Sequence, residues 1–124
     1  VGSEMCIRDS LLLCELGVGE NPHKWAKHMS GGEKQRVAAA RVLFQKPRIY
    51  FADEPASSLD AYYAGRVLGL LRQEADEKGK PVLCVLHNAE HIQRFADIAL
   101  SLNQNDPKAH KMRRVRPVNE EAEI

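Results

Sequence analysis

The chain has 124 residues, which is enough for one domain at most and need not be a complete one. A hydrophobic fraction of 44%, a charged fraction of 28% and a net charge of +1 are typical of a globular protein and give no indication of nucleic-acid binding. The three cysteines form no C-x-x-C pair and favour reduced thiols, and the apolar runs are too short for a membrane span.

The first ten residues, VGSEMCIRDS, do not continue the pattern of the rest of the chain. They lack the long apolar core of a signal peptide, and we interpret 1–10 as doubtful or non-native sequence with a junction near Ser10. The apolar residues 11–16 that follow are predicted to end a helix, which Gly17 stops.

A second helix is predicted to open at Ser30 and to end before Pro47. Ser30, with Glu33 three residues later, is a capping box, which stabilises a helix by about 1 kcal/mol. The intervening Gly31 and Gly32 would let an anion approach the unpaired N–H groups at the helix start. The alternative is that these glycines only serve a tight turn before a capped helix.

Residues 48–55, RIYFADEP, form a β-rich run whose apolar character stops at Asp53 and Glu54. We expect a buried strand that ends in these two carboxylates. Such a pair suits a magnesium-nucleotide site, where one acid holds the metal and its neighbour polarises water. The alternative is that Asp53 simply caps the turn before Pro55.

Helical and strand patterns then alternate as far as residue 102. A helix closed by Gly79 is expected first, then a second buried strand that ends at His87, then a short helix and a third strand. Their expected ranges are 61–78, 81–87, 88–96 and 98–102. The alternation predicts an α/β layered sheet, whose ligands bind beyond the carboxyl ends of the strands.

The pattern gives way to polar residues from Asn103. A basic run over 108–116 and an acidic end over 120–123 follow, and we interpret 103–124 as a polar, charged tail. The basic run could contact acidic lipid or a partner, but a solvated tail is the interpretation we adopt.

Four short motifs occur in order along the chain: MSGGEKQRVAAARVL, RIYFADEP, SSLD and VLCVLHN. Together they resemble the nucleotide-binding domain of the ABC ATPases, where they correspond to the signature motif, Walker B with its catalytic glutamate, the D-loop and the H-loop. The resemblance covers 11–102, a partial ABC ATPase domain. It implies the carboxyl-terminal half of a P-loop NTPase fold, with parallel-sheet strands, flanking helices and the end of the helical signature subdomain.

The resemblance also implies roles for single residues. Asp53 would hold Mg²⁺ through water, and Glu54 would act as general base or orient the attacking water. His87 would contact the γ-phosphate of ATP, although a lone strand-end histidine can also be satisfied in a core. The other nucleotide contacts that it implies are Ser30, Gly31, Gly32, Glu33 and the D-loop aspartate Asp60.

The residues after the glycine pair have a less specific interpretation. We interpret Lys34, Gln35 and Arg36 as solvated or structural, with a supporting role allowed for Gln35 or Arg36.

The sequence contains no G-x-x-x-x-G-K-[ST] phosphate loop. A Q-loop and an adenine-stacking aromatic residue are not recognisable either, so we expect the other half of the domain upstream of Val1. The isolated chain is predicted to be inactive. With part of its core uncovered, it is also predicted to be marginally stable or prone to associate.

The leading hypothesis is the ATP-binding and hydrolysing subunit of an ABC transporter, of the bacterial importer type, that powers transport through a membrane partner. It would use ATP and Mg²⁺, pair with a second ATPase subunit, and lie in the cytoplasm on the inner face of the cell membrane beside a permease subunit. No direct contact with nucleic acid is expected. The alternative is a soluble ABC ATPase of DNA repair or translation, which shares the motifs and which long heptad coiled coils or a second cassette upstream would favour.

Overall fold

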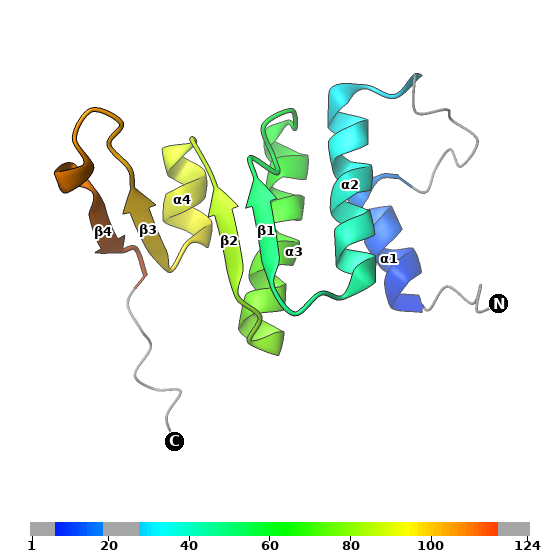
Figure 1. The fold of residues 1–124 in the computed structure, drawn as a ribbon. Coiled ribbons are helices and arrows are strands. Elements are labelled where there is room, and N and C mark those ends of the chain that lie inside the picture. The colour runs from blue at the N-terminus through cyan, green and yellow to red at the C-terminus, as the bar shows by residue number, and fades with distance from the viewer. Residues whose placement is uncertain (1–6, 19–27, 117–124) are drawn as a thin grey trace. The chain divides into compact units, whose positions relative to one another are not determined.

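A computed structural model describes residues 7–18 and 28–116. The chain divides into two compact units, Val1–Val85 and Leu86–Ile124, traced from blue to orange in Figure 1. Residues 1–6 of the doubtful segment and the acidic end at 120–123 lie outside the described residues. Among the helices that the structure describes, none combines the length and the apolar character that crossing a membrane requires.

The first unit alternates helices and strands, as the sequence predicts. Its elements are α1 (Ile7–Leu16), α2 (Gly31–Gln45), β1 (Tyr50–Asp53), α3 (Ala61–Lys78) and β2 (Val82–Val85). The two strands are parallel and in register from Tyr50 opposite Val82 to Asp53 opposite Val85. The predicted strand–helix–strand crossover is therefore confirmed over residues 50–85.

The end of α1 is set by the predicted glycine stop. Gly17 has a φ of 64°, which residues other than glycine adopt at an energetic cost. Its N–H donates to the carbonyl of Cys14, and the N–H of Val18 donates to that of Leu13, the pair of hydrogen bonds of a Schellman cap. The helix itself begins at Ile7, inside the segment interpreted as doubtful.

Local caps fix the bounds of the two longer helices. The Ser30 Oγ accepts from the Glu33 N–H at 3.1 Å, which confirms Ser30 as the N-cap of α2. Asp60 does the same for α3 by accepting from the N–H of Tyr63, and Gly79 closes that helix with a φ of 63°. The predicted range 61–78 is thus confirmed at both ends.

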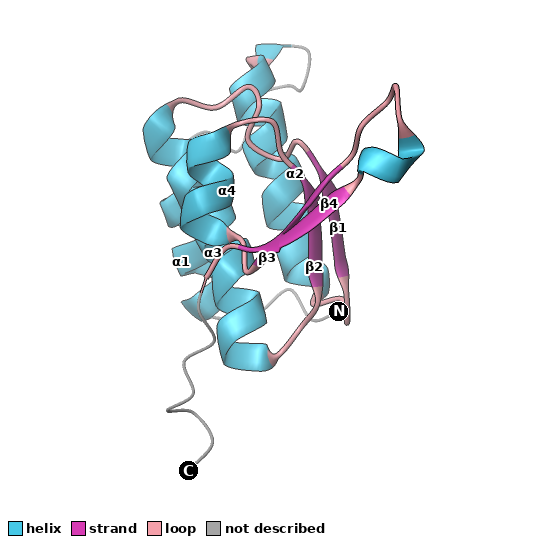
Figure 2. Ribbon diagram, turned by 90° about the vertical axis from the view of Figure 1, so that its left-hand side faces the viewer, coloured by secondary structure: helices cyan, strands magenta, loops and turns pink. Residues whose placement is uncertain are grey.

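The core of this unit lies between the helices and one face of the two strands. Leu16, Ala40 and Val67 form one buried cluster that joins α1, α2 and α3. Leu43, Tyr50 and Leu71 form a second, which joins α2 and α3 to β1. Figure 2 shows α1 and α3 on the same side of β1 and β2. The side chains of Tyr50, Ala52 and Val82 belong to the covered face.

The other face of these strands differs from the prediction of buried strands. Its side chains are exposed: 72% for Phe51, 57% for Leu83 and 51% for Val85. Successive side chains of a strand point to opposite faces, so the described helices leave this second face uncovered. The apolar sequences of β1 and β2 predict burial on both faces. In the part of the chain that the structure describes, only one face is covered.

The second unit holds α4 (Ala89–Phe95), β3 (Ile98–Ser101), a short 3₁₀ turn (Pro107–Ala109) and β4 (Lys111–Arg114). The short helix and the third strand are as predicted. The strand β4 falls inside the predicted solvated tail and pairs with β3 in antiparallel register, Leu100 opposite Met112. Its four side chains are exposed, so the pairing rests on backbone hydrogen bonds that composition does not reveal.

Candidate nucleotide site

The start of α2 presents the features of an anion site on a helix of 15 residues. Ser30 has an extended backbone and an exposed side chain, and Gly31 and Gly32 are the first two helical residues. The first N–H groups of a helix have no partner within the helix, and the aligned peptide dipoles give its start a partial positive charge. This end of α2 can therefore bind a phosphate oxygen.

Gly32 also serves a close contact within the chain. A Cβ added at Gly32 would lie 3.0 Å from the carbonyl oxygen of Ser58, whereas one added at Gly31 would meet only the Ser58 side chain, at 3.7 Å. The two glycines thus differ: Gly32 lets the loop before α3 approach the helix, and Gly31 leaves its side open. Neither glycine has a positive φ, and both are residues of α2 itself, so the turn-only alternative does not describe where they lie.

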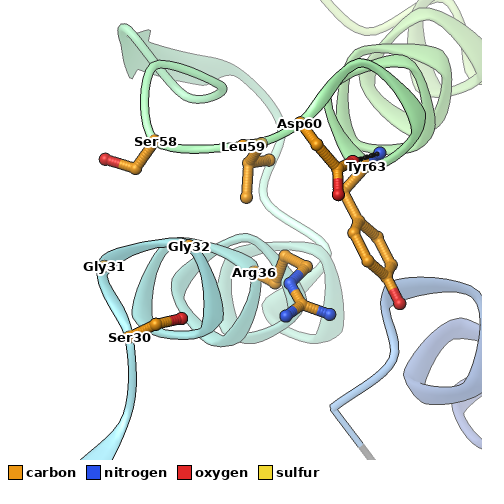
Figure 3. Close-up of a pocket in the computed structure, with 8 residues that line it drawn as sticks. All are labelled: Ser30, Gly31, Gly32, Arg36, Ser58, Leu59, Asp60 and Tyr63. Carbon is orange, nitrogen blue, oxygen red and sulfur yellow. Dashed lines mark hydrogen bonds between the residues drawn. The ribbon is translucent and has the colours of Figure 1, made fainter.

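An open depression of about 480 Å³ lies between the start of α2 and the loop that leads into α3. Figure 3 shows the residues of α2 on one side and those of the loop on the other. Its lining consists of Ser30, Gly31, Gly32, Arg36, Ser58, Leu59, Asp60 and Tyr63. The structure therefore brings the predicted signature residues together with the predicted D-loop aspartate, whose carboxylate caps α3.

Arg36 and Tyr63 form the inner wall of this depression. The Arg36 guanidinium lies 3.9 Å from the centroid of the Tyr63 ring, and its Nη1 donates to the carbonyl of Leu16 at 2.9 Å. One side chain of α2 thus contacts the end of α1 and the first turn of α3. The structural interpretation of Arg36 is confirmed.

The two predicted catalytic carboxylates follow each other at the end of β1. Asp53 is the last residue of the strand and is exposed, and its carboxylate makes no hydrogen bond within the described part of the chain. The turn that follows is closed by its backbone, with the Ser57 N–H donating to the carbonyl of Glu54 at 3.3 Å. The alternative that Asp53 caps this turn is therefore wrong.

Asp53 fits a magnesium ion that arrives with a nucleotide. No group of three or more possible metal ligands occurs in residues 7–18 or 28–116. Mg²⁺ is usually held by one or two carboxylates together with substrate phosphates and water, so it does not need a cage of protein ligands. Asp53 offers one carboxylate of the kind that this mode of binding uses, with the remaining ligands to come from phosphates and water.

Glu54 has a backbone that is unusual for its residue type. Its φ is 47°, in the left-handed region. Its N–H donates to the carbonyl of Val85 at 2.9 Å, and its own carbonyl accepts from the Gln35 Nε2 at 2.9 Å. The second contact, from α2, agrees with the supporting role that the resemblance allows for Gln35, although the sequence does not predict its partner. Its only signal is that Gln35 lies three residues after Gly32, on the helix face that approaches the loop.

His87 belongs to the second unit. It follows β2, its side chain is exposed, and Asn88 after it caps α4 by accepting from the N–H groups of Glu90 and His91. The alternative of a histidine satisfied in a core is therefore wrong for the described residues, and the contact to the γ-phosphate stays a prediction.

Comparison with known proteins places these motifs in one family. The ABC transporter family model matches residues 9–57. The chain is 42% identical over 87 residues to the phosphonates import ATP-binding protein of Frankia casuarinae, which covers 70% of this chain and 34% of that protein. It is 42% identical over 90 residues to the phosphite import ATP-binding protein of Stutzerimonas stutzeri, covering 73% and 33%.

A solved structure gives the same result for the fold. A dimeric ATP-binding cassette in a post-hydrolysis state, bound to ADP and Pi, superposes with a TM-score of 0.75 at 26% identity, over 94% of this chain and 52% of that one. The chain spans about a third of the length of the curated relatives that it matches. The fold is thus part of a P-loop NTPase domain, and the chain belongs to the ABC transporter family.

Proposed function

We propose that this chain is part of the ATP-hydrolysing subunit of an ABC importer. The observation that carries the proposal is the Asp53–Glu54 pair at the end of β1, in a chain whose relatives bear the names of phosphonate and phosphite import proteins. Those names support an importer over a soluble ATPase of DNA repair or translation. The proposed partners are a second ATPase subunit and a membrane permease, with the subunit on the cytoplasmic face of the membrane.

The proposed chemistry is attack of water on the γ-phosphate of ATP. Glu54 takes the proton of the attacking water or orients it, which is worth about 10²- to 10⁴-fold in rate. Asp53 holds Mg²⁺ through water, and the bound ion neutralises charge on the phosphates. His87 contacts a γ-phosphate in this proposal.

The start of α2 serves a different nucleotide in this proposal. Ser30, Gly31, Gly32 and Glu33 face the γ-phosphate of ATP that is held by the phosphate loop of the second subunit, with Asp60 at the same boundary. A helix start without a neighbouring Gly-Lys-Ser/Thr sequence suits this arrangement, because the α- and β-phosphates are held elsewhere.

The test uses a chimera in which this chain replaces the matching segment of the Frankia casuarinae relative. We call this chimera the complete domain. We expect magnesium-dependent phosphate release by the complete domain and none by the 124-residue chain alone. Glu54→Gln should reduce the release at least about 100-fold and trap an ATP-bound dimer in light scattering. Glu77→Gln, on the exposed side of α3, is the matched control and should change neither. Unchanged turnover in Glu54→Gln would sink the catalytic assignment.

A second experiment addresses transport. Deleting the corresponding gene in the source organism should abolish growth on a phosphonate or on phosphite as the sole phosphorus source. Growth on orthophosphate should remain. If growth on both reduced phosphorus sources is unaffected while the complete domain hydrolyses ATP, the ATPase proposal stands and the importer proposal fails.

A further inference from the structure

The side chain of Gln35 connects α2 to the loop that begins with Glu54. Its Nε2 donates to the carbonyl of Glu54 at 2.9 Å and to the Ser57 Oγ at 3.2 Å. Its Oε1 accepts from the N–H of Ser58 at 2.9 Å. These three bonds span 19 to 23 residues of sequence, so one amide joins two segments that the chain itself does not hold together.

The loop needs such a contact because Glu54 is held in a conformation that is unfavourable for it. A left-handed backbone brings the Cβ of a non-glycine residue close to its own carbonyl oxygen and persists only where the surroundings fix it. The hydrogen bond to Val85 fixes the N–H side of Glu54, and the carbonyl side is held by Gln35 together with the longer bond from the Ser57 N–H. The direction in which the Glu54 side chain leaves the backbone depends on both.

The chemistry of the contact is specific to a primary amide. The Glu54 carbonyl requires a donor and the Ser58 N–H requires an acceptor, while the Ser57 hydroxyl can take either role, all within reach of one terminal group. A glutamate at position 35 could accept but not donate, and a lysine could donate but not accept.

The position of α2 beside the loop is itself fixed on two sides. Gly32, one turn before Gln35, has the space that lets the Ser58 carbonyl come close. Arg36, the next residue, holds the helix to Leu16 and Tyr63. A displacement of the start of α2 would therefore move the amide of Gln35 and, through its hydrogen bond, the backbone of Glu54.

We propose that Gln35 is a positioning residue that holds Glu54 in its catalytic orientation and links this carboxylate to the anion-binding start of α2. The inference rests on the proposed function. Under it, Glu54 acts on one ATP and the start of α2 contacts the other, so Gln35 is the physical link between the two nucleotide sites of the dimer.

The kinetic test compares Gln35→Ala and Gln35→Glu in the complete domain with the matched control Gln45→Ala, an exposed glutamine at the end of α2. Misplacing a catalytic group by about 1 Å can lower the rate about 100-fold. We expect both Gln35 variants to lower kcat by about 10- to 100-fold with KM for ATP within about twofold, and Gln45→Ala to change neither. An unchanged kcat in Gln35→Glu overturns the proposal, and this variant decides if Gln35→Ala does not fold.

Amide hydrogen exchange tests the contact without any need for turnover. Gln35→Ala should increase the exchange rate of the Ser58 N–H at least about tenfold, whereas Gln35→Glu keeps an acceptor for this N–H and should preserve its protection. Equal protection of Ser58 in the wild type and in Gln35→Ala overturns the positioning role. If the complete domain does not hydrolyse ATP, the proposed function fails and the exchange result alone decides whether Gln35 holds the loop.

Discussion

Gly32 and Ser58 approach each other so closely that a single methyl group on the glycine would lie 3.0 Å from the Ser58 carbonyl oxygen. This distance is shorter than an ordinary carbon–oxygen contact, and the atom that it meets is backbone. The glycine pair at the start of α2 therefore combines two separate requirements. One glycine is needed for packing against the loop, and its neighbour has an open side.

The two glycines are predicted to respond differently to alanine. Gly32→Ala in the complete domain should lower the free energy of unfolding by about 1–3 kcal/mol, because the Ser58 backbone has to move. Gly31→Ala makes only an ordinary contact with the Ser58 side chain and should be neutral or stabilising by up to about 1 kcal/mol, since alanine favours the helix. Urea unfolding of both variants measures this difference. Equal loss in both would show that the close approach to Ser58 does not decide the effect.

Arg36 is predicted to stabilise the first unit through two distinct contacts. Arg36→Ala removes the hydrogen bond to Leu16 and the contact with the Tyr63 ring, and we expect a loss of about 1–3 kcal/mol. Tyr63→Phe keeps the aromatic face and should cost much less. Arg41→Ala, an exposed arginine on the same helix, is the control and should stay within about 0.5 kcal/mol of the wild type. Denaturant unfolding of the complete domain measures all three, and a Tyr63→Phe loss as large as that of Arg36→Ala would contradict the cation–π contribution.

Glu74 is a buried carboxylate with two lysine partners. Its side chain is 4% exposed, and its oxygens lie 2.9 Å from the Lys78 Nζ and 3.4 Å from the Lys80 Nζ. Burial would raise the pKa of this carboxyl, but the hydrogen bonds and charges of the two lysines outweigh burial and lower the pKa below its ordinary value. The charged form is thus favoured by folding.

The lowered pKa of Glu74 gives a signed pH dependence. Because the carboxyl binds a proton less readily when folded, its contribution to stability is present above the ordinary pKa of 4.5 and is lost as the pH falls through the lower folded value. Glu74→Gln should therefore lower the free energy of unfolding at pH 7. Below pH 4.5 the free energy of unfolding of this variant should fall less steeply with decreasing pH than that of the wild type. Glu77→Gln, at an exposed position of the same helix, is the control. If Glu74→Gln and the wild type lose stability in parallel on acidification, the lysines do not hold this carboxyl charged.

Features set by local chemistry are those that the sequence predicts well. The helix α3 begins after Asp60 and ends before Gly79 as expected, because a carboxylate N-cap and a left-handed glycine act within a few residues of themselves. The same holds for Ser30 and for the Gly17 stop. The Asp53–Glu54 pair is likewise predicted, since the end of a short apolar run marks the end of β1.

Features set by distant contacts could not be predicted in the same way. The role of Gln35 depends on a loop about 20 residues away, and its spacing from Gly32 in α2 does not identify the groups in that loop that it contacts. The pairing of β4 with β3 depends on backbone hydrogen bonds, and the basic side chains of β4 give no sequence signal that predicts this pairing. The exposed face of β1 and β2 could not be predicted either. An apolar run indicates that a strand tends to be buried, but it does not identify the element that covers each face.

That exposed face supplies the last prediction. Phe51 and Leu83 lie opposite each other in the parallel pair and are 72% and 57% exposed, so the 124-residue chain should bind an apolar fluorescent dye and associate in light scattering. Phe51→Ser should reduce both signals.

In the complete domain we expect the same face to be covered. There, Phe51→Ser should lower the free energy of unfolding by about 1.5–3 kcal/mol. Val42→Ser, at an exposed apolar position of α2, is the matched control and should have little effect in either form. Should Phe51→Ser leave the stability of the complete domain unchanged, this face is solvated there as well, and the rest of the domain packs elsewhere.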